Sequence, residues 1–172
     1  MNLQSNDFEL FGVPEQFAQD AGRIDARWKE LQREAHPDRF AAQGAAAQRI
    51  AMQWSVRINE AYKRLKDPLK RAAYLCELRG APVDAENNTA MPADFLVEQM
   101  EWREALDEAG SLEAVDRLDE QIVRARREAL QQIAHLLDDR RDANNAAQRV
   151  RALMFIERFG EDVRSRAEQL GQ

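Results

Sequence analysis

The chain has 172 residues, of which 33% are charged, 44% are apolar and 7% are aromatic, and its formal net charge is −6. Its single cysteine, Cys76, excludes an intrachain disulfide framework and a metal site made only of thiolates. No apolar run approaches the length of about 18 residues expected of a membrane span, the N-terminus has neither the basic start nor the apolar core of a secretory signal, and the acidic charge argues against general nucleic-acid binding.

Charge and turn residues divide the chain into two parts. Residues 1–80 carry 13 basic and 11 acidic side chains, a net charge of +2, whereas residues 81–172 carry 12 and 20, a net charge of −8. All five prolines lie at or before Pro92, and the stretch from Arg79 to Pro92 is rich in turn residues without a helical period. We therefore predict a first domain over residues 1–77, a linker over 78–91 and a second domain over 92–172.

Both domains are predicted to be helical, because apolar residues recur at intervals of three and four and no stretch alternates with a period of two. In the first domain we expect a short helix over 7–11, a second helix capped by Asp20 and stopped by Pro37, a longer third helix, and a fourth over 69–78. The expected core stripes are Ile24, Trp28, Leu31 and Ala35 on the second helix, and Ile50, Trp54, Ile58, Ala61, Tyr62 and Leu65 on the third.

The second domain is predicted to contain three long helices with short connections, which is typical of an antiparallel bundle. The first runs over about 93–109 and ends at Gly110, Ser111 caps the second, and a turn at 142–145 leads into the third. The expected core residues are Leu118, Ile122, Ala125, Ala129, Ile133 and Leu136 on the second helix, and Val150, Leu153, Phe159, Val163 and Leu170 on the third.

Between the second and third helices of the first domain lies the tripeptide His36-Pro37-Asp38. The residues alone leave open an ordinary helix-stopping loop, a partly buried histidine bonded to a carbonyl, and a His/Asp catalytic pair. Catalysis would also need a nucleophile or a metal in a pocket. The only other histidine is His135, Cys76 lies far along the chain, and side chains on either side of a proline diverge, so the enzyme is the least favoured interpretation.

The surroundings of this tripeptide resemble a J-domain over about residues 5–76. The matching residues are Asp7-Phe8-x-Leu10-Phe11-Gly12-Val13-Pro14, Trp28-Lys29-x-Leu31-x-Arg33-x-x-His36-Pro37-Asp38-Arg39-Phe40 and Ile58-Asn59-Glu60-Ala61-Tyr62-x-x-Leu65-x-Asp67-Pro68-x-x-Arg71-Ala72-x-Tyr74. The resemblance implies that His36-Pro37-Asp38 docks on a DnaK-class chaperone and stimulates its ATP hydrolysis, and that the chain itself is not an enzyme.

The residue types suit a docking loop. Pro37 fixes one backbone dihedral, so the loop loses less entropy on binding. Lys29 and Arg33 lie four residues apart and point away from the apolar stripe; they form either a solvated face or, beside the loop, charges that steer an acidic chaperone surface. The helix is less basic than is usual in J-domains, because it also carries Asp25, Glu30 and Glu34. This departure favours a dedicated chaperone partner.

The first helix of the second domain has two apolar faces. One, expected to face the core, consists of Phe95, Gln99, Trp102, Leu106 and Ala109 within about 80° of arc. The other consists of Leu96, Val97 and Met100, with Glu101, Glu104 and Glu108 beside them. On the last helix, Phe155 is predicted to lie off the core face, roughly opposite Val150. The extra apolar residues indicate a partner site with an acidic rim; alternatively, Leu96 and Val97 pack against the linker or the first domain.

This helix, following a J-domain, resembles the HscB family of J-type co-chaperones of iron–sulfur cluster assembly. The motif is Phe95-Leu96-x-Glu98-Gln99-x-Glu101-x-Arg103-Glu104-x-Leu106-Asp107-Glu108. The resemblance implies that an IscU-like cluster scaffold protein contacts Leu96, Val97, Met100, Glu101, Glu104, Glu108 and Phe155. Val97 stands where methionine is more usual, and Met100 where leucine is.

Together these observations predict an all-α, cytoplasmic co-chaperone with an N-terminal J-domain and a C-terminal antiparallel three-helix bundle. The resemblance implies that it delivers the scaffold to a specialised, HscA-like chaperone of the DnaK class and so promotes cluster transfer. The nucleotide and the cluster then belong to the partners, and no cofactor or metal is expected on this chain, nor binding to nucleic acid or membranes. The alternative is a J-domain adaptor with a different client protein.

Overall fold

The computed structural model describes residues 2–172, and every regular element within that range is helical, which confirms the predicted all-α fold. Packing divides the chain into a first unit, residues 1–75, and a second unit, residues 76–172. Among the described residues, no helix combines the length and the apolarity needed to cross a membrane.

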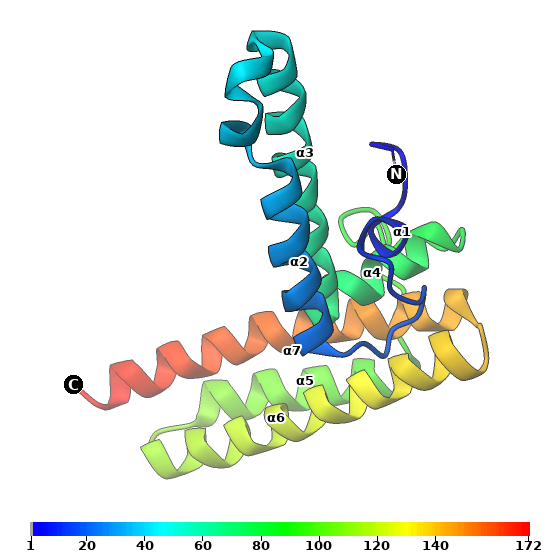
Figure 1. The fold of residues 1–172 in the computed structure, drawn as a ribbon. Helices are drawn as coiled ribbons and strands as arrows, with labels where there is room; N and C mark the ends of the chain where they lie inside the picture. Colours follow the sequence, from blue (N-terminus) through cyan, green and yellow to red (C-terminus); the bar gives the residue numbers. More distant parts are fainter. Residues whose placement is uncertain (1) are drawn as a thin grey trace. The chain divides into compact units, whose positions relative to one another are not determined.

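The first unit is built on two antiparallel helices, α2 (Ala21–Ala35) and α3 (Ala45–Lys66), which lie side by side in Figure 1. The 3-10 segment η1 (Pro37–Gln43) joins them. α1 (Asp7–Phe11) precedes the pair, and α4 (Pro68–Leu78) follows it and continues past the division between the units. The largest fully buried apolar side chains of this unit are Phe8, Leu10, Phe11, Ile24, Leu31, Ile58, Leu65 and Leu75.

Local sequence sets the ends of these helices, and the predicted cap at Asp20 and stop at Pro37 are both confirmed. Side-chain oxygens of Asn6 and Asp20 accept backbone N–H groups from the first turns of α1 and α2. Gly12 ends α1 with a φ of 64°, in the left-handed region that glycine enters without steric cost. α2 ends at His36, which is extended (φ −62°, ψ 129°) because the proline that follows disfavours helical backbone.

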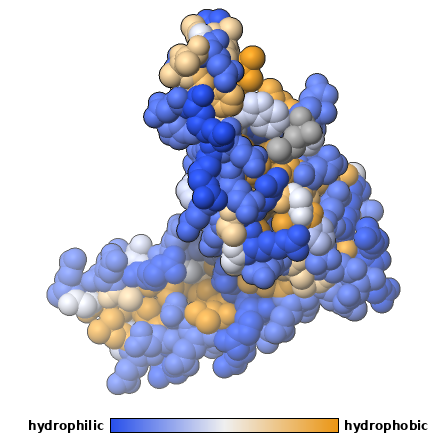
Figure 2. Space-filling model, in the orientation of Figure 1, coloured by the Kyte–Doolittle hydropathy of each residue, from blue (hydrophilic) through white to orange (hydrophobic). Residues whose placement is uncertain are grey.

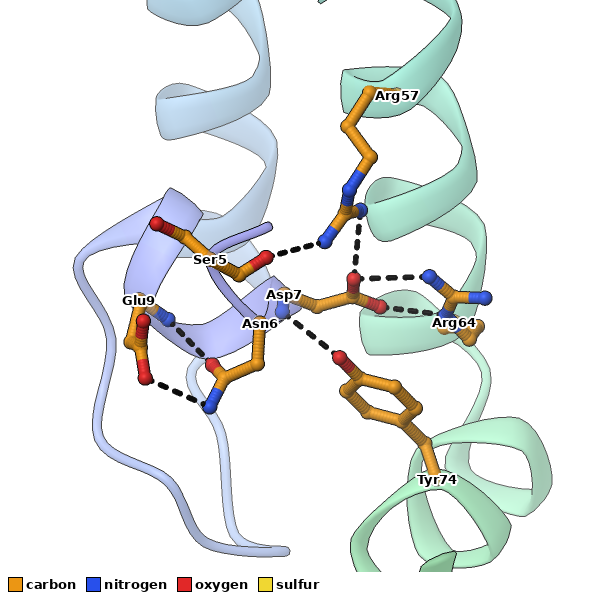
Figure 3. A network of polar contacts seen from close by, with 7 residues as sticks. All are labelled: Ser5, Asn6, Asp7, Glu9, Arg57, Arg64 and Tyr74. Carbon is orange, nitrogen blue, oxygen red and sulfur yellow. Dashed lines mark hydrogen bonds and ion pairs between the residues drawn. The ribbon is translucent and has the colours of Figure 1, made fainter. Parts of the chain in front are cut away.

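A buried carboxylate ties α1 to the rest of the first unit (Figure 3). The side chain of Asp7 is fully buried and accepts from Arg64 at 2.6 Å (Nε) and 2.9 Å (Nη2), while Nη1 of Arg57 lies 2.7 Å from its Oδ1. The backbone N–H of Asp7 donates to the hydroxyl of Tyr74 at 3.1 Å. The hydrogen bonds to Asp7 raise the pKa of Arg64 above its ordinary value.

The second unit contains three long antiparallel helices, α5 (Ala93–Glu108), α6 (Leu112–Ala134) and α7 (Ala143–Leu170) (Figure 1). As predicted, Ser111 caps α6: its hydroxyl accepts from the N–H of Ala114 at 3.2 Å. Asp142 caps α7 by accepting hydrogen bonds from the backbone N–H and the side-chain amide of Asn145. These two hydrogen bonds lower the pKa of the Asp142 carboxyl. The unit therefore has the predicted bundle topology.

A π-helical turn, η2 (His135–Asp139), corrects the predicted core of α6. The 3.6-residue period placed Leu136 in the core, but the fully buried side chain is that of Leu137, and Leu136 is half-buried. A π-turn inserts one residue into the helical ladder, so the inward face moves on by one position.

The segment between α4 and α5 is held by a buried arginine of α7. Arg151 is 5% exposed, and its guanidinium donates to the carbonyls of Val83 (2.8 Å), Ala90 (3.0 Å) and Pro82 (3.4 Å). Val83 is itself buried, whereas residues 84–90 are all exposed. The segment thus forms a surface loop whose two ends are fixed to the second unit.

Candidate functional site: an exposed loop and an exposed helix face

The loop His36-Pro37-Asp38, here called the docking loop, lies between α2 and η1. Nδ1 of His36 accepts the backbone N–H of Asp38 at 3.2 Å, and the carbonyl of His36 accepts from Arg39 at 3.0 Å. Because Nδ1 acts as an acceptor, the ring proton in this arrangement resides on Nε2. The side chains of His36 and Asp38 are 56% and 92% exposed. The loop is thus fixed by short-range bonds and presents its side chains to solvent.

The charges predicted to flank the docking loop are exposed on α2. Lys29 and Arg33 both reach solvent, and the carbonyl of Arg33 accepts from Nη1 of Arg39 at 3.1 Å. This bond ties the end of α2 to the segment just after Asp38. The structure therefore brings Arg33 and the docking loop together, with Lys29 one turn further back on the same helix.

Polar and aromatic contacts fix α2 against α3 below the docking loop. Trp28, which we predicted to lie in the core stripe, is only half-buried; it stacks on Tyr62 with ring centroids 4.8 Å apart, and its indole N–H donates to Asn59 at 3.0 Å. The hydroxyl of Tyr62 donates to Asp25 at 2.7 Å, and Lys66 forms an ion pair with the same carboxylate. The hydrogen bonds from Lys66 and Tyr62 lower the pKa of Asp25.

The structure contains an apolar groove between α2, η1 and α3 that was not predicted from the sequence. It encloses about 370 Å³ and is lined mainly by Leu31, Ala35, Phe40, Ile50 and Trp54. Ile50 was predicted to be in the core but is 55% exposed, because it borders this open groove and not a closed interior. Figure 2 shows apolar surface gathered at this tip, where η1 meets α3.

The second exposed constellation is the outer face of α5, defined by Leu96, Val97, Met100, Glu101, Glu104 and Glu108. Its three apolar side chains are 45%, 59% and 71% exposed in that order, and the three glutamates are exposed as well. The opposite face of α5 buries Phe95 and Trp102. The prediction of two apolar faces on this helix is therefore confirmed, and large apolar side chains exposed this far are typical of an interaction surface.

The prediction that Phe155 lies off the core face of α7 is wrong. It is only 8% exposed, and its ring packs against Phe95 and Phe159, each with a centroid distance of 5.7 Å. The helical wheel failed here because α7 is buried around most of its circumference: Val150, Arg151, Ala152, Leu153, Phe155 and Ile156 are all buried. On such a helix the side opposite Val150 is also interior.

α5 is held to α7 along its length. Nη2 of Arg149 lies 3.8 Å from Asp94 at the start of the helix, and Nη2 of Arg166 donates to the carbonyl of Ala109 at its end, at 3.1 Å. Between them, Trp102 stacks on Phe159 with a centroid distance of 5.9 Å. On the same helix, Oε1 of Gln99 is buried, and no hydrogen-bond donor reaches it from the described residues.

The titratable groups of the second unit show no arrangement typical of catalysis. Burial, followed by repulsion from Glu128, Asp94 and Glu101, raises the pKa of Glu98. Burial raises the pKa of the Cys76 thiol to about 11, which makes it a poor nucleophile near neutral pH. Within residues 2–172, no group of three or more histidine, cysteine, aspartate or glutamate side chains is placed to hold a metal ion.

Comparisons with known proteins identify the family. The chain is 49% identical to the co-chaperone protein HscB homolog of Burkholderia multivorans, over 99% of this chain and 98% of that protein, and 48% identical with the same coverage to the homolog of Burkholderia cenocepacia. The chain belongs to the HscB family of co-chaperones. Residues 91–164 match the family model described as the HSCB C-terminal oligomerisation domain.

Solved HscB structures share the whole fold. Chaperone HscB from Vibrio cholerae is 35% identical with a TM-score of 0.80, covering 96% of this chain and 99% of that one. The human co-chaperone protein HscB is 25% identical with a TM-score of 0.87, covering 96% and 83%. The predicted membership of the HscB family and the predicted helical architecture are both confirmed.

Proposed function

We propose that this HscB-family co-chaperone binds an IscU-like iron–sulfur scaffold protein and delivers it to an HscA-like chaperone of the DnaK class in the cytoplasm. Stimulation of the chaperone ATPase then promotes transfer of the cluster from the scaffold to acceptor proteins. The division of labour follows the proposed domains: a J-domain over 1–77, a linker over 78–91 and a scaffold-binding bundle over 92–172.

The observation that carries the proposal is the outer face of α5. Three large apolar side chains stand exposed in a row on a helix whose other face already packs in the bundle, so they serve no core. Burying them against a partner removes apolar surface from water, at about 25 cal/mol per Å². The three glutamates beside them favour a scaffold with basic side chains around an apolar centre.

The docking loop supplies the second contact in this proposal. Its backbone is fixed by the bonds of His36 and Arg39, so little entropy is lost when a chaperone engages it. His36 Nε2–H and the Asp38 carboxylate remain available to the chaperone, and Lys29 and Arg33 steer an acidic surface toward them. No step of this mechanism needs a catalytic residue or a metal on this chain.

Two matched pairs of variants test the proposal. Asp38→Asn should abolish stimulation of the chaperone ATPase and leave scaffold affinity unchanged, whereas Glu60→Gln, which removes an exposed charge on α3, should change neither.

Leu96→Ser combined with Met100→Ser should weaken scaffold binding in calorimetry by more than tenfold, whereas Leu112→Ser should not, although Leu112 is as exposed as Leu96 (45% each). Stimulation that survives Asp38→Asn contradicts the J-domain mechanism, and unchanged affinity in the α5 variant favours an adaptor with a different client.

A further inference from the structure

The ring of Phe155 lies just under the surface, at the boundary between the core and the outer face of α5. Phe95 meets it edge-on at an interplanar angle of 75°, and Phe159 lies nearly parallel to it at 12°. With 8% of the residue exposed, only a small part of the ring reaches solvent. What covers the rest of its outward side therefore decides whether a partner can touch it.

Arg103 supplies that cover. Its guanidinium carbon lies 5.2 Å from the centroid of Phe155, a distance typical of a cation–π contact. Arg103 is exposed, and within residues 2–172 no carboxylate oxygen lies within 4.0 Å of its guanidinium nitrogens. The side chain is thus held over Phe155 by the ring and not by an ion pair.

Helix geometry places this cover next to the outer face of α5. At 100° per residue, Arg103 lies about 20° from Leu96 and about 60° from Met100 around the helix axis. Side chains on a helix also lean toward its N-terminus, so Arg103 reaches back over the turn that carries Met100. Moving the guanidinium aside would join the ring of Phe155 to Leu96 and Met100 in one continuous apolar surface.

We infer that Arg103 is a movable cover over Phe155, and that the scaffold displaces it so that an apolar side chain of the scaffold packs on the exposed ring between Leu96 and Met100. The inference rests on the proposed scaffold binding. An exposed guanidinium on a ring is a weak contact, so displacement costs little, while the covered ring stays shielded from water until the partner arrives. Arg103 therefore acts as a specificity-determining residue, because a partner without an apolar side chain at this point gains nothing by moving it.

A double-mutant cycle on the full chain tests this role, with scaffold affinity measured by calorimetry. Arg103→Ala should bind the scaffold about two- to fivefold more tightly, which is the size of one exposed cation–π contact. The gain should disappear in a Phe155→Leu background, since leucine keeps apolar volume but has no ring for the guanidinium to cover. Arg124→Ala, which removes an exposed arginine from α6, serves as the control for a general change of charge and should leave affinity unchanged.

Salt dependence separates the cover from simple electrostatics. A gain caused by uncovering Phe155 should be the same at low and high ionic strength, whereas a gain caused by a more acidic surface should fade with salt. Weaker scaffold binding by Arg103→Ala would overturn the inference, because it would make Arg103 a direct contact of the partner. A gain in affinity that persists in the Phe155→Leu background would overturn it as well.

A spectroscopic measurement keeps the test independent of folding defects in the phenylalanine variant. In the free protein, the side-chain protons of Arg103 should show an upfield ring-current shift in NMR spectra, and addition of the scaffold should remove it. A shift that survives saturation with the scaffold contradicts the displacement. If the wild-type chain does not bind the scaffold at all, the proposed function fails, whereas normal binding with no effect of Arg103 contradicts the cover alone.

Discussion

The docking loop and the outer face of α5 differ in how the chain holds them in place. The loop is shaped by neighbours in sequence: Pro37 ends α2, His36 accepts from Asp38, and Arg39 donates to Arg33. The face of α5 depends on distant residues, because the rings of Phe155 and Phe159 and the carbonyl contact of Arg166 come from α7. The difference predicts that changes in the core of the second unit disturb one function and spare the other.

The largest expected effect comes from removing the ring that seats α5. Trp102 is 2% exposed and packs on Phe95 and Phe159. Trp102→Ala should lower the free energy of unfolding of the second unit by about 3–5 kcal/mol, the usual cost of deleting a large buried aromatic side chain. Scaffold affinity measured by calorimetry should fall with it, while stimulation of the chaperone ATPase without scaffold should stay at the wild-type level. Equal losses of both would show that the two surfaces are not independent.

The converse change targets the first unit. Asp7→Ala removes the buried carboxylate that faces Arg57 and Arg64, leaving two partly buried guanidinium groups without their counter-charge. We expect the first unit to lose about 3 kcal/mol of stability. Thermal unfolding followed by circular dichroism should show an earlier first transition, and ATPase stimulation should decline at temperatures where scaffold binding persists. Asp7→Asn, which keeps one acceptor oxygen, should lose less; an unchanged transition in both variants contradicts the role given to this network.

A smaller effect, of opposite sign, is expected beneath α5. Oε1 of Gln99 is buried without a donor, and a buried polar atom in this state costs about 1 kcal/mol or more. Gln99→Leu should therefore raise the melting temperature of the second unit in differential scanning calorimetry, with scaffold affinity unchanged because residue 99 faces inward. A lower melting temperature would mean that the amide makes a favourable contact in solution.

The smallest effect is a pH dependence of the α2–α3 pair. The hydrogen bonds from Lys66 and Tyr62 lower the pKa of Asp25 below its ordinary value of 3.8. The folded state therefore binds a proton at Asp25 less readily than the unfolded state, so the stabilisation is complete well above pH 3.8 and is lost as the pH falls through the folded-state pKa. Asp25→Asn should lower the melting temperature of the first unit at neutral pH, and the difference from wild type should shrink in acid. A difference independent of pH would contradict this assignment.

The difference between contacts with sequence neighbours and contacts with distant residues also explains which features could be predicted from the sequence. Caps at Asp20 and Ser111, the stop at Pro37 and the two faces of α5 depend on residues a few positions apart, so their patterns are visible in the sequence. The burial of Phe155 could not be read from its own helix, because it is decided by Phe95 some sixty positions earlier. Leu137 replaced Leu136 in the core because a π-turn changes the period on which the prediction rests. Ile50 stayed exposed because α2, η1 and α3 leave an open groove beside it, and its own helix gives no sign of that groove.

The grip of Arg151 on the loop before α5 has a practical consequence. Because the carbonyls of Val83 and Ala90 are both bound to one buried guanidinium, the ends of the loop stay together whatever lies between them. Closing a longer loop costs little additional entropy once its ends are fixed. Residues 85–88, all exposed, are therefore a suitable place to insert a peptide tag or a fluorescent reporter.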